Sequence, residues 1–207
     1  MSASEAVVFN GPAGVLEGLI DKPAGQPSAV AVVCHPHPLY QGSMHNKVAY
    51  ILSRAFNELG GISLRFNFRG VGASDGEYAD GVGETADALA AIDWLTARHP
   101  GLPLWLAGFS FGAYVALRAQ SQRPVKLLVT VAPAVERFDT SGVVLPTMPW
   151  LLVQGDADEV VAPQAVLDWV AGLAKPPQLA VLKGAGHFFH GRLNELRQTV
   201  VDAFTGG

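Results

Sequence analysis

Apolar and amphipathic segments alternate along most of this chain. Short runs rich in apolar residues predict strands, at residues 14–21, 28–34, 62–66, 102–107, 125–131, 149–154 and 179–182. Longer segments between them are typical of helices, at residues 43–59, 83–98, 113–119, 163–173 and 192–204. Nearly continuous apolar strands that alternate with helices predict a mostly parallel, twisted sheet with helices on both faces. The chain is therefore expected to have an α/β fold.

Local signals bound several of these helices. Ser43 is expected to cap the first one, because a serine hydroxyl can accept a hydrogen bond from an unpaired N–H group of the first turn. Pro100 and Gly101 are expected to end the helix that begins near Gly83. Pro163 suits a first helical turn, where its missing N–H costs nothing.

Length and composition narrow the functional classes. The chain has 207 residues, of which 49% are hydrophobic, and this fits a single domain over residues 1–207. The net charge is −4 and no basic run occurs, so neither nucleic acid nor an anionic membrane surface is an expected partner. Cys34 is the only cysteine and cannot form an internal disulfide. No stretch has transmembrane length, and the start lacks the features of a signal peptide, so a cytoplasmic location is expected.

The most informative motif is Gly-Phe-Ser-Phe-Gly at residues 108–112, between a predicted strand and a predicted helix. A G-x-S-x-G sequence at such a junction is typical of a nucleophile elbow, which exposes the serine on a strained turn. Flanking glycines let strand and helix pack closely without a Cβ clash. The alternative is an ordinary glycine-rich helix start with Ser110 as its N-cap.

A histidine and an acidic residue follow at suitable places. The strand at 149–154 leads into a loop with three acids, and the strand at 179–182 leads to Gly184-Ala185-Gly186-His187. The carboxyl ends of parallel strands are where such sheets place catalytic groups. A serine nucleophile needs a base, and the base needs an orienting acid. His190 competes with His187, but the glycines before His187 allow its loop to bring an imidazole over the serine.

The chain resembles the α/β-hydrolase superfamily along nearly its whole length. The segments His35-Pro36-His37-Pro38, Asn46-Lys47-Val48 and 64–74 resemble a small bacterial branch of lidless serine hydrolases that is grouped with dienelactone hydrolases. True dienelactone hydrolases use a cysteine nucleophile, whereas this elbow carries Ser110, so dienelactone chemistry is not expected. The connection 132–148 is too short for a cap domain, which predicts an open site.

The resemblance implies a role for each group. Ser110 is the expected nucleophile, His187 the general base and Asp158 the acid that holds the imidazole tautomer. Three acids share this loop, and the resemblance favours Asp158 among them. Asp156 is better placed to bond amides of its own loop, and Glu159 is expected to be solvated.

Two backbone N–H groups are expected to form an oxyanion hole. Phe111 follows the nucleophile and supplies one of them. The other comes from the loop after the strand at 28–34, where alternating prolines lack an N–H and leave His37 and Leu39. Relatives with His-Gly-x at this point use the third residue, which corresponds to His37. Leu39, Tyr40 and Phe109 are candidates for the pocket wall.

Histidines at 35, 37 and 45 also admit a metal site, but the loop already has an explanation, so neither metal nor cofactor is expected. The expected activity is hydrolysis of small esters or thioesters through an acyl-enzyme, since an open site suits short acyl groups. Alternatives are a peptidase or amidase with the same groups, and a binding or scaffold protein that kept the fold. The oligomeric state stays open.

Overall fold

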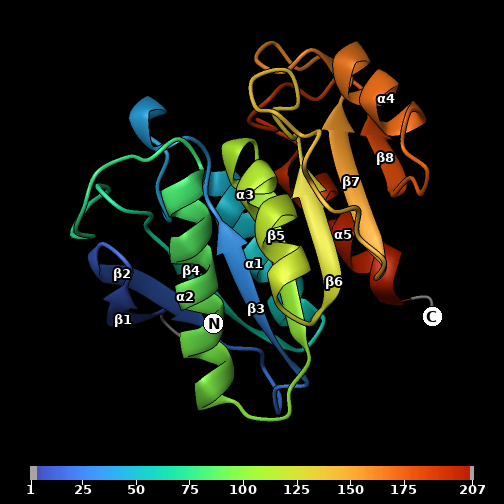
Figure 1. The fold of residues 1–207 in the computed structure, drawn as a ribbon. Coiled ribbons are helices and arrows are strands. Elements are labelled where there is room, and N and C mark those ends of the chain that lie inside the picture. Colours follow the sequence, from blue (N-terminus) through green and yellow to red (C-terminus); the bar gives the residue numbers. More distant parts are fainter. Residues whose placement is uncertain (1–3, 206–207) are drawn as a thin grey trace.

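The computed structural model describes residues 4–205, which form one eight-stranded sheet covered by helices (Figure 1). The strands are β1 (Glu5–Gly11), β2 (Gly14–Asp21), β3 (Ala29–Cys34), β4 (Gly61–Phe66), β5 (Leu104–Phe109), β6 (Val125–Val131), β7 (Trp150–Gly155) and β8 (Gln178–Leu182). The helices are α1 (Lys47–Glu58), α2 (Val82–Arg98), α3 (Phe111–Ala119), α4 (Pro163–Ala171) and α5 (Leu193–Thr205), with short 3₁₀ turns at Pro38–Tyr40 and Gln120–Gln122.

The strand order is β1-β2-β4-β3-β5-β6-β7-β8. Strands from β4 to β8 in this order pair in parallel, whereas β2 is antiparallel to both β1 and β4. The predicted α/β architecture is thus confirmed. Strand β1 was not predicted, because it forms a half-exposed hairpin at the sheet edge and Val8 at its centre is 67% exposed.

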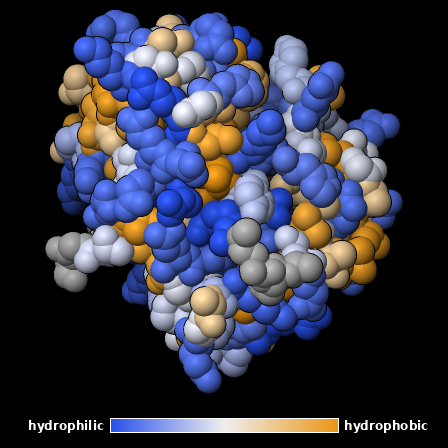
Figure 2. Space-filling model, turned by 180° about the vertical axis from the view of Figure 1, so that it is seen from behind, coloured by the Kyte–Doolittle hydropathy of each residue, from blue (hydrophilic) through white to orange (hydrophobic). Residues whose placement is uncertain are grey.

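Each face of the sheet carries its own hydrophobic core. Helices α2, α3 and α4 cover one face, and α1 and α5 cover the other (Figure 1). Neighbouring residues of β3 illustrate the division, since Val30 and Val32 pack into the first core and Ala31 and Val33 into the second. Seen from the side of α1 and α5, the surface is mostly hydrophilic with smaller apolar areas (Figure 2).

The start of α1 differs from the prediction. Asn46 is its N-cap, and the Asn46 Oδ1 atom accepts hydrogen bonds from the N–H groups of Val48 and Ala49. Ser43 lies three residues earlier, where its carbonyl oxygen accepts from the Asn46 N–H and closes a turn. The predicted cap at Ser43 was wrong because this turn inserts a bend before the helix.

The connection between β6 and β7 contains no helix or strand in the described structure. It passes over the carboxyl ends of the strands, and the cleft there is left without a cap domain. No helix between residues 4 and 205 combines the length and apolar character that crossing a membrane requires.

Candidate active site

Ser110 occupies a sharp turn between β5 and α3. Its backbone has φ 55° and ψ −116°, a conformation that costs an L-residue free energy and that surrounding structure must hold in place. The Ser110 N–H donates to the Val131 carbonyl at 2.8 Å, which ties the turn to β6. The Ser110 hydroxyl makes no capping hydrogen bond. The hydroxyl is therefore not engaged by its own helix.

Two glycines make this turn possible. A Cβ atom at Gly108 would lie 2.0 Å from the Gly112 carbonyl oxygen. A Cβ atom at Gly112 would lie 2.3 Å from the carbonyl oxygen of Cys34, at the end of β3. Since backbone atoms cannot move aside easily, strand, turn and helix reach this spacing only with glycine at both positions.

Asp158 follows β7 and is buried. Its Oδ1 atom accepts hydrogen bonds from the N–H groups of Val160 and Val161, each at 2.8 Å. Its Oδ2 atom accepts from Gln154 Nε2 at 3.1 Å and is 2.9 Å from His187 Nδ1. Burial by itself raises the pKa of this carboxyl, but the hydrogen bonds from His187 and the backbone outweigh burial and lower it. The side chain is thus held as a carboxylate that only accepts hydrogen bonds.

His187 is only 2% exposed and is fixed on several sides. Because Asp158 is a carboxylate, His187 Nδ1 carries the proton and donates it, which leaves Nε2 without a hydrogen in the neutral ring. The His187 N–H donates to Glu159 Oε2 at 3.1 Å. The ring of Phe109 packs against the imidazole with centroids 4.8 Å apart.

The other two acids of the loop and the competing histidine do not contact the His187 ring. Asp156 Oδ1 accepts from the Gly184 N–H, so it braces the loop before His187 rather than its own loop. Glu159 is exposed, in agreement with the expected solvation, and its Oε2 atom also accepts from the His187 N–H. His190 is exposed and lies outside the cavity lining.

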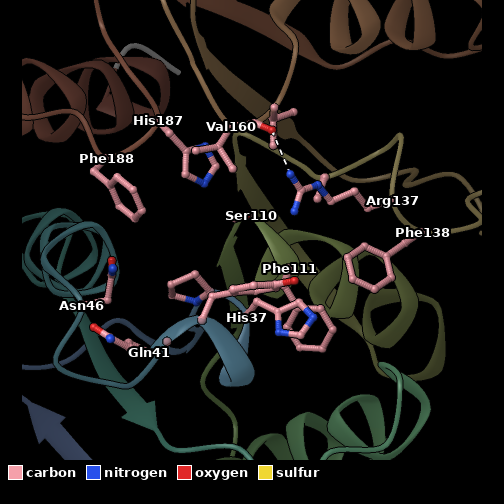
Figure 3. Close-up of a pocket in the computed structure, with 15 residues that line it drawn as sticks. His37, Gln41, Asn46, Ser110, Phe111, Arg137, Phe138, Val160, His187 and Phe188 are labelled. Carbon is pink, nitrogen blue, oxygen red and sulfur yellow. Dashed lines mark hydrogen bonds between the residues drawn. The ribbon is translucent and has the colours of Figure 1, made fainter.

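A cavity of about 450 Å³ opens above the elbow (Figure 3). Its lining contains Ser110 and His187 together with Pro36, His37, Tyr40, Gln41, Gly42, Asn46, Phe111, Ala134, Arg137, Phe138, Val160, Val161 and Phe188. Of the expected wall residues, Tyr40 is present. The prediction that Leu39 and Phe109 line the pocket was wrong. Leu39 is 67% exposed outside the lining, and Phe109 is fully buried beneath His187.

His35 anchors the loop that follows β3. Its Nδ1–H donates to the Pro36 carbonyl at 2.6 Å, and its Nε2 accepts from the Phe68 N–H at 3.1 Å. Burial lowers the pKa of His35 to about 3, so the ring is neutral. Both ring nitrogens are engaged within the protein, and neither is free for a metal ion.

The His37 ring shapes the same loop. Its Nδ1 accepts from the Leu39 N–H at 3.2 Å, and its Nε2 lies 3.2 Å from the Tyr78 hydroxyl. Leu39 has therefore already used its N–H. Among the backbone hydrogen bonds of turns and loops within residues 4–205, none has the His37 N–H as its donor. The Phe111 N–H stands at the first position of α3, where a helix offers no partner.

Several residues of this site had no clear sequence signal. Gln154, which donates to Asp158, is an exception, because a polar residue near the end of an apolar strand is itself a signal. Arg137, Phe138 and Phe188 border the cavity from loops, and only the fold brings those loops to the elbow.

Comparison with known proteins gives this arrangement a family. The family model described as serine aminopeptidase, S33, matches residues 25–146. An uncharacterised protein of Rickettsia prowazekii is 37% identical over 206 residues, which is 95% of this chain and 87% of that protein.

Two solved structures have a TM-score of 0.94 to this chain. A lidless α/β serine hydrolase of Xanthomonas campestris is 44% identical, and the match covers 98% of this chain and 94% of that one. An α/β serine hydrolase homologue of Coxiella burnetii is 43% identical, and the match covers 99% of this chain and 99% of that one. The chain therefore belongs to the family described as serine aminopeptidase, S33, within the α/β-hydrolase superfamily, and it has the fold of the lidless serine hydrolases.

Proposed function

We propose that this protein hydrolyses small esters or thioesters through an acyl-enzyme on Ser110. The observation that carries the proposal is the buried pair of Asp158 and His187, 2.9 Å apart, in which His187 lines the same cavity as Ser110 in its strained elbow. A free serine hydroxyl is a poor nucleophile, and a positioned imidazole with a fixed tautomer supplies the missing base.

In the first half of the reaction, Ser110 Oγ attacks the carbonyl carbon of the ester while its proton moves to His187 Nε2. The carbonyl oxygen becomes an alkoxide. When this intermediate collapses, the bond to the leaving group breaks, and the His187 imidazolium returns the proton to the departing alcohol or thiol. Asp158 stays ionised throughout and stabilises the imidazolium.

In the second half, water takes the place of the leaving group. His187 removes a proton from the water molecule, whose oxygen attacks the acyl carbon. Collapse of the second intermediate releases the carboxylic acid and gives the proton back to Ser110 Oγ. The enzyme returns to its starting state, and the net change is one ester bond hydrolysed by one water.

The N–H groups of Phe111 and His37 are the proposed donors to the alkoxide. One such donor contributes roughly a hundredfold to a thousandfold in rate, because it is fixed before charge develops. His37 is favoured over Leu39, since the Leu39 N–H is bonded to the His37 ring. The stiff, doubly anchored loop suits a donor that must not move.

The shape of the cavity favours short acyl groups. Its wall is partly aromatic, but Tyr40 is 74% exposed and Phe188 40% exposed at its edge. With no cap domain above it in the described structure, this site offers little closed apolar area to a long chain.

An aminopeptidase is the second candidate, because the family model carries that description. A free peptide amino group is bound most strongly where a carboxylate can pair with the ammonium. The described cavity lining contains Arg137 and neither aspartate nor glutamate. The described lining itself therefore offers no carboxylate to pair with the free amino terminus of a peptide.

The test is hydrolysis of para-nitrophenyl esters from acetate to palmitate by the wild type, Ser110→Ala and Ser121→Ala. Ser121 is an exposed serine just after α3 and serves as the matched control. We expect activity on short chains, a decline with length, and loss of activity in Ser110→Ala alone. Equal rates in Ser110→Ala and wild type would refute the proposal. Faster hydrolysis of amino-acid para-nitroanilides than of any para-nitrophenyl ester would refute it as well.

A further inference from the structure

The side chains that line the cavity include one with a permanent charge, and that charge is positive. Arg137 is the only lysine or arginine in the lining, and the lining contains no aspartate or glutamate. This single fixed positive charge faces the site of a protein whose net charge is −4. A substrate that carries an anion would therefore be favoured at this cavity over one that carries a cation.

Arg137 is an exposed residue of the cavity lining, and no carboxylate of the described residues neutralises it. It lies on the connection between β6 and β7, and its Nη2 donates to the Val160 carbonyl at 3.4 Å. Within residues 4–205, no carboxylate lies within 4.0 Å of its guanidinium. Its neighbour Asp139 instead accepts from the Ser141 N–H. Most of the five N–H donors of Arg137 therefore stay available to a ligand.

The two sides of the cavity differ in chemistry (Figure 3). Arg137 and Phe138 lie on one side, and Asn46 and Phe188 on the other. Asn46 Oδ1 is used in capping α1, so its remaining polar group is a neutral amide donor. A carboxylate thus finds a charged, forked partner on the Arg137 side only.

We propose that Arg137 forms a carboxylate subsite, and that the preferred substrates are esters or thioesters with a free carboxylate remote from the bond that is cleaved. This inference rests on the proposed hydrolase function and specifies its substrate class. The guanidinium binds the carboxylate through paired N–H donors, while the aromatic wall of Phe111 and Phe138 packs against the linker. Binding then orients the scissile carbonyl over Ser110.

The test uses substrate pairs in which the remote group is either a carboxylate or its uncharged methyl ester. One pair is para-acetoxybenzoate and its methyl ester, with the charge on the leaving group. The other pair is mono-para-nitrophenyl adipate and its methyl ester, with the charge on the acyl group. The quantity measured is the ratio of kcat/KM within each pair, so that general effects of a mutation on catalysis cancel.

Arg137→Gln, Arg137→Lys and Arg54→Gln are compared with the wild type. Arg54 lies on α1 and is not part of the lining, so its substitution removes the same charge outside the cavity. For at least one pair, Arg137→Gln is expected to lower the ratio of carboxylate to methyl ester by about tenfold, the value of one charge-assisted contact. Arg137→Lys is expected to recover part of it, and Arg54→Gln to leave it unchanged. An unchanged ratio for both pairs in Arg137→Gln would overturn the inference.

A binding measurement separates this inference from the hydrolase proposal. Calorimetry compares para-acetoxybenzoate with its methyl ester, and monomethyl adipate with dimethyl adipate, on Ser110→Ala and on Ser110→Ala with Arg137→Gln. Tighter binding of a carboxylate that the second substitution removes supports the subsite, even if no ester is turned over. Equal binding in both pairs overturns it, even if the neutral esters are hydrolysed well.

Discussion

Acidification is expected to destabilise this protein through His35. The ring is fully buried beside the proposed oxyanion loop, with Nδ1–H donating to Pro36 and Nε2 accepting from Phe68. A second proton would have to enter at Nε2, where it would remove the acceptor of the Phe68 N–H. Together with burial, this makes the charged ring unfavourable in the folded state.

The size of the effect follows from proton linkage. The pKa of His35 is about 3 in the folded protein, against 6.5 as its ordinary value. Well above pH 6.5 neither state holds the extra proton, so stability is unaffected. Below it the unfolded chain binds a proton that the folded protein refuses, and stability falls until the pH approaches 3. Between pH 7 and pH 5 the loss is about 2 kcal/mol.

The assay is urea unfolding at pH 7 and pH 5 of the wild type and of His35→Gln, whose amide keeps a donor and an acceptor. Each protein is compared with itself, so a lower starting stability of the variant does not matter. The loss on acidification is expected to be about 2 kcal/mol larger in the wild type. Equal losses in both proteins would show that His35 does not carry the effect and would refute the reasoning.

Two further variants test the elbow and the acid. Asp158→Asn is expected to lower kcat by roughly a thousandfold or more in ester hydrolysis, because an amide does not enforce the His187 tautomer; retention of most activity would contradict the assignment. Gly112→Ala is expected to lower the free energy of unfolding by about 3 kcal/mol, since its Cβ would meet the Cys34 carbonyl oxygen. Gly142→Ala, with no atom within 4 Å of the added Cβ, is the control in chemical denaturation and should change stability by less than about 0.5 kcal/mol.

Much of the architecture could be predicted because the relevant signals are local. Continuous apolar runs such as Ala29–Cys34 form strands buried on both faces, and glycines around Ser110 mark a turn that few other residues allow. Strand β1 was missed because an edge strand is half exposed. Ser43 and Asn46 are both good caps by residue type, and only the turn between them decides which one is used.

The site was harder to predict because it depends on which loops meet. Phe109 is next to the nucleophile in sequence, yet it points beneath His187, since successive residues of a strand face opposite sides of the sheet. Spacing alone did not separate Asp158 from Asp156 and Glu159. In the structure Asp156 accepts from the Gly184 N–H and Glu159 from the His187 N–H. Of the three acids, only Asp158 contacts the His187 ring.

The most direct test of the central proposal is covalent labelling by a fluorophosphonate probe, read by intact mass and peptide mapping. The wild type is expected to gain one adduct, located on Ser110, and Ser110→Ala to gain none. His187→Ala is expected to react far more slowly while remaining folded by circular dichroism. Labelling of Ser110→Ala to the same extent as the wild type, or no labelling of the folded wild type, would contradict the account.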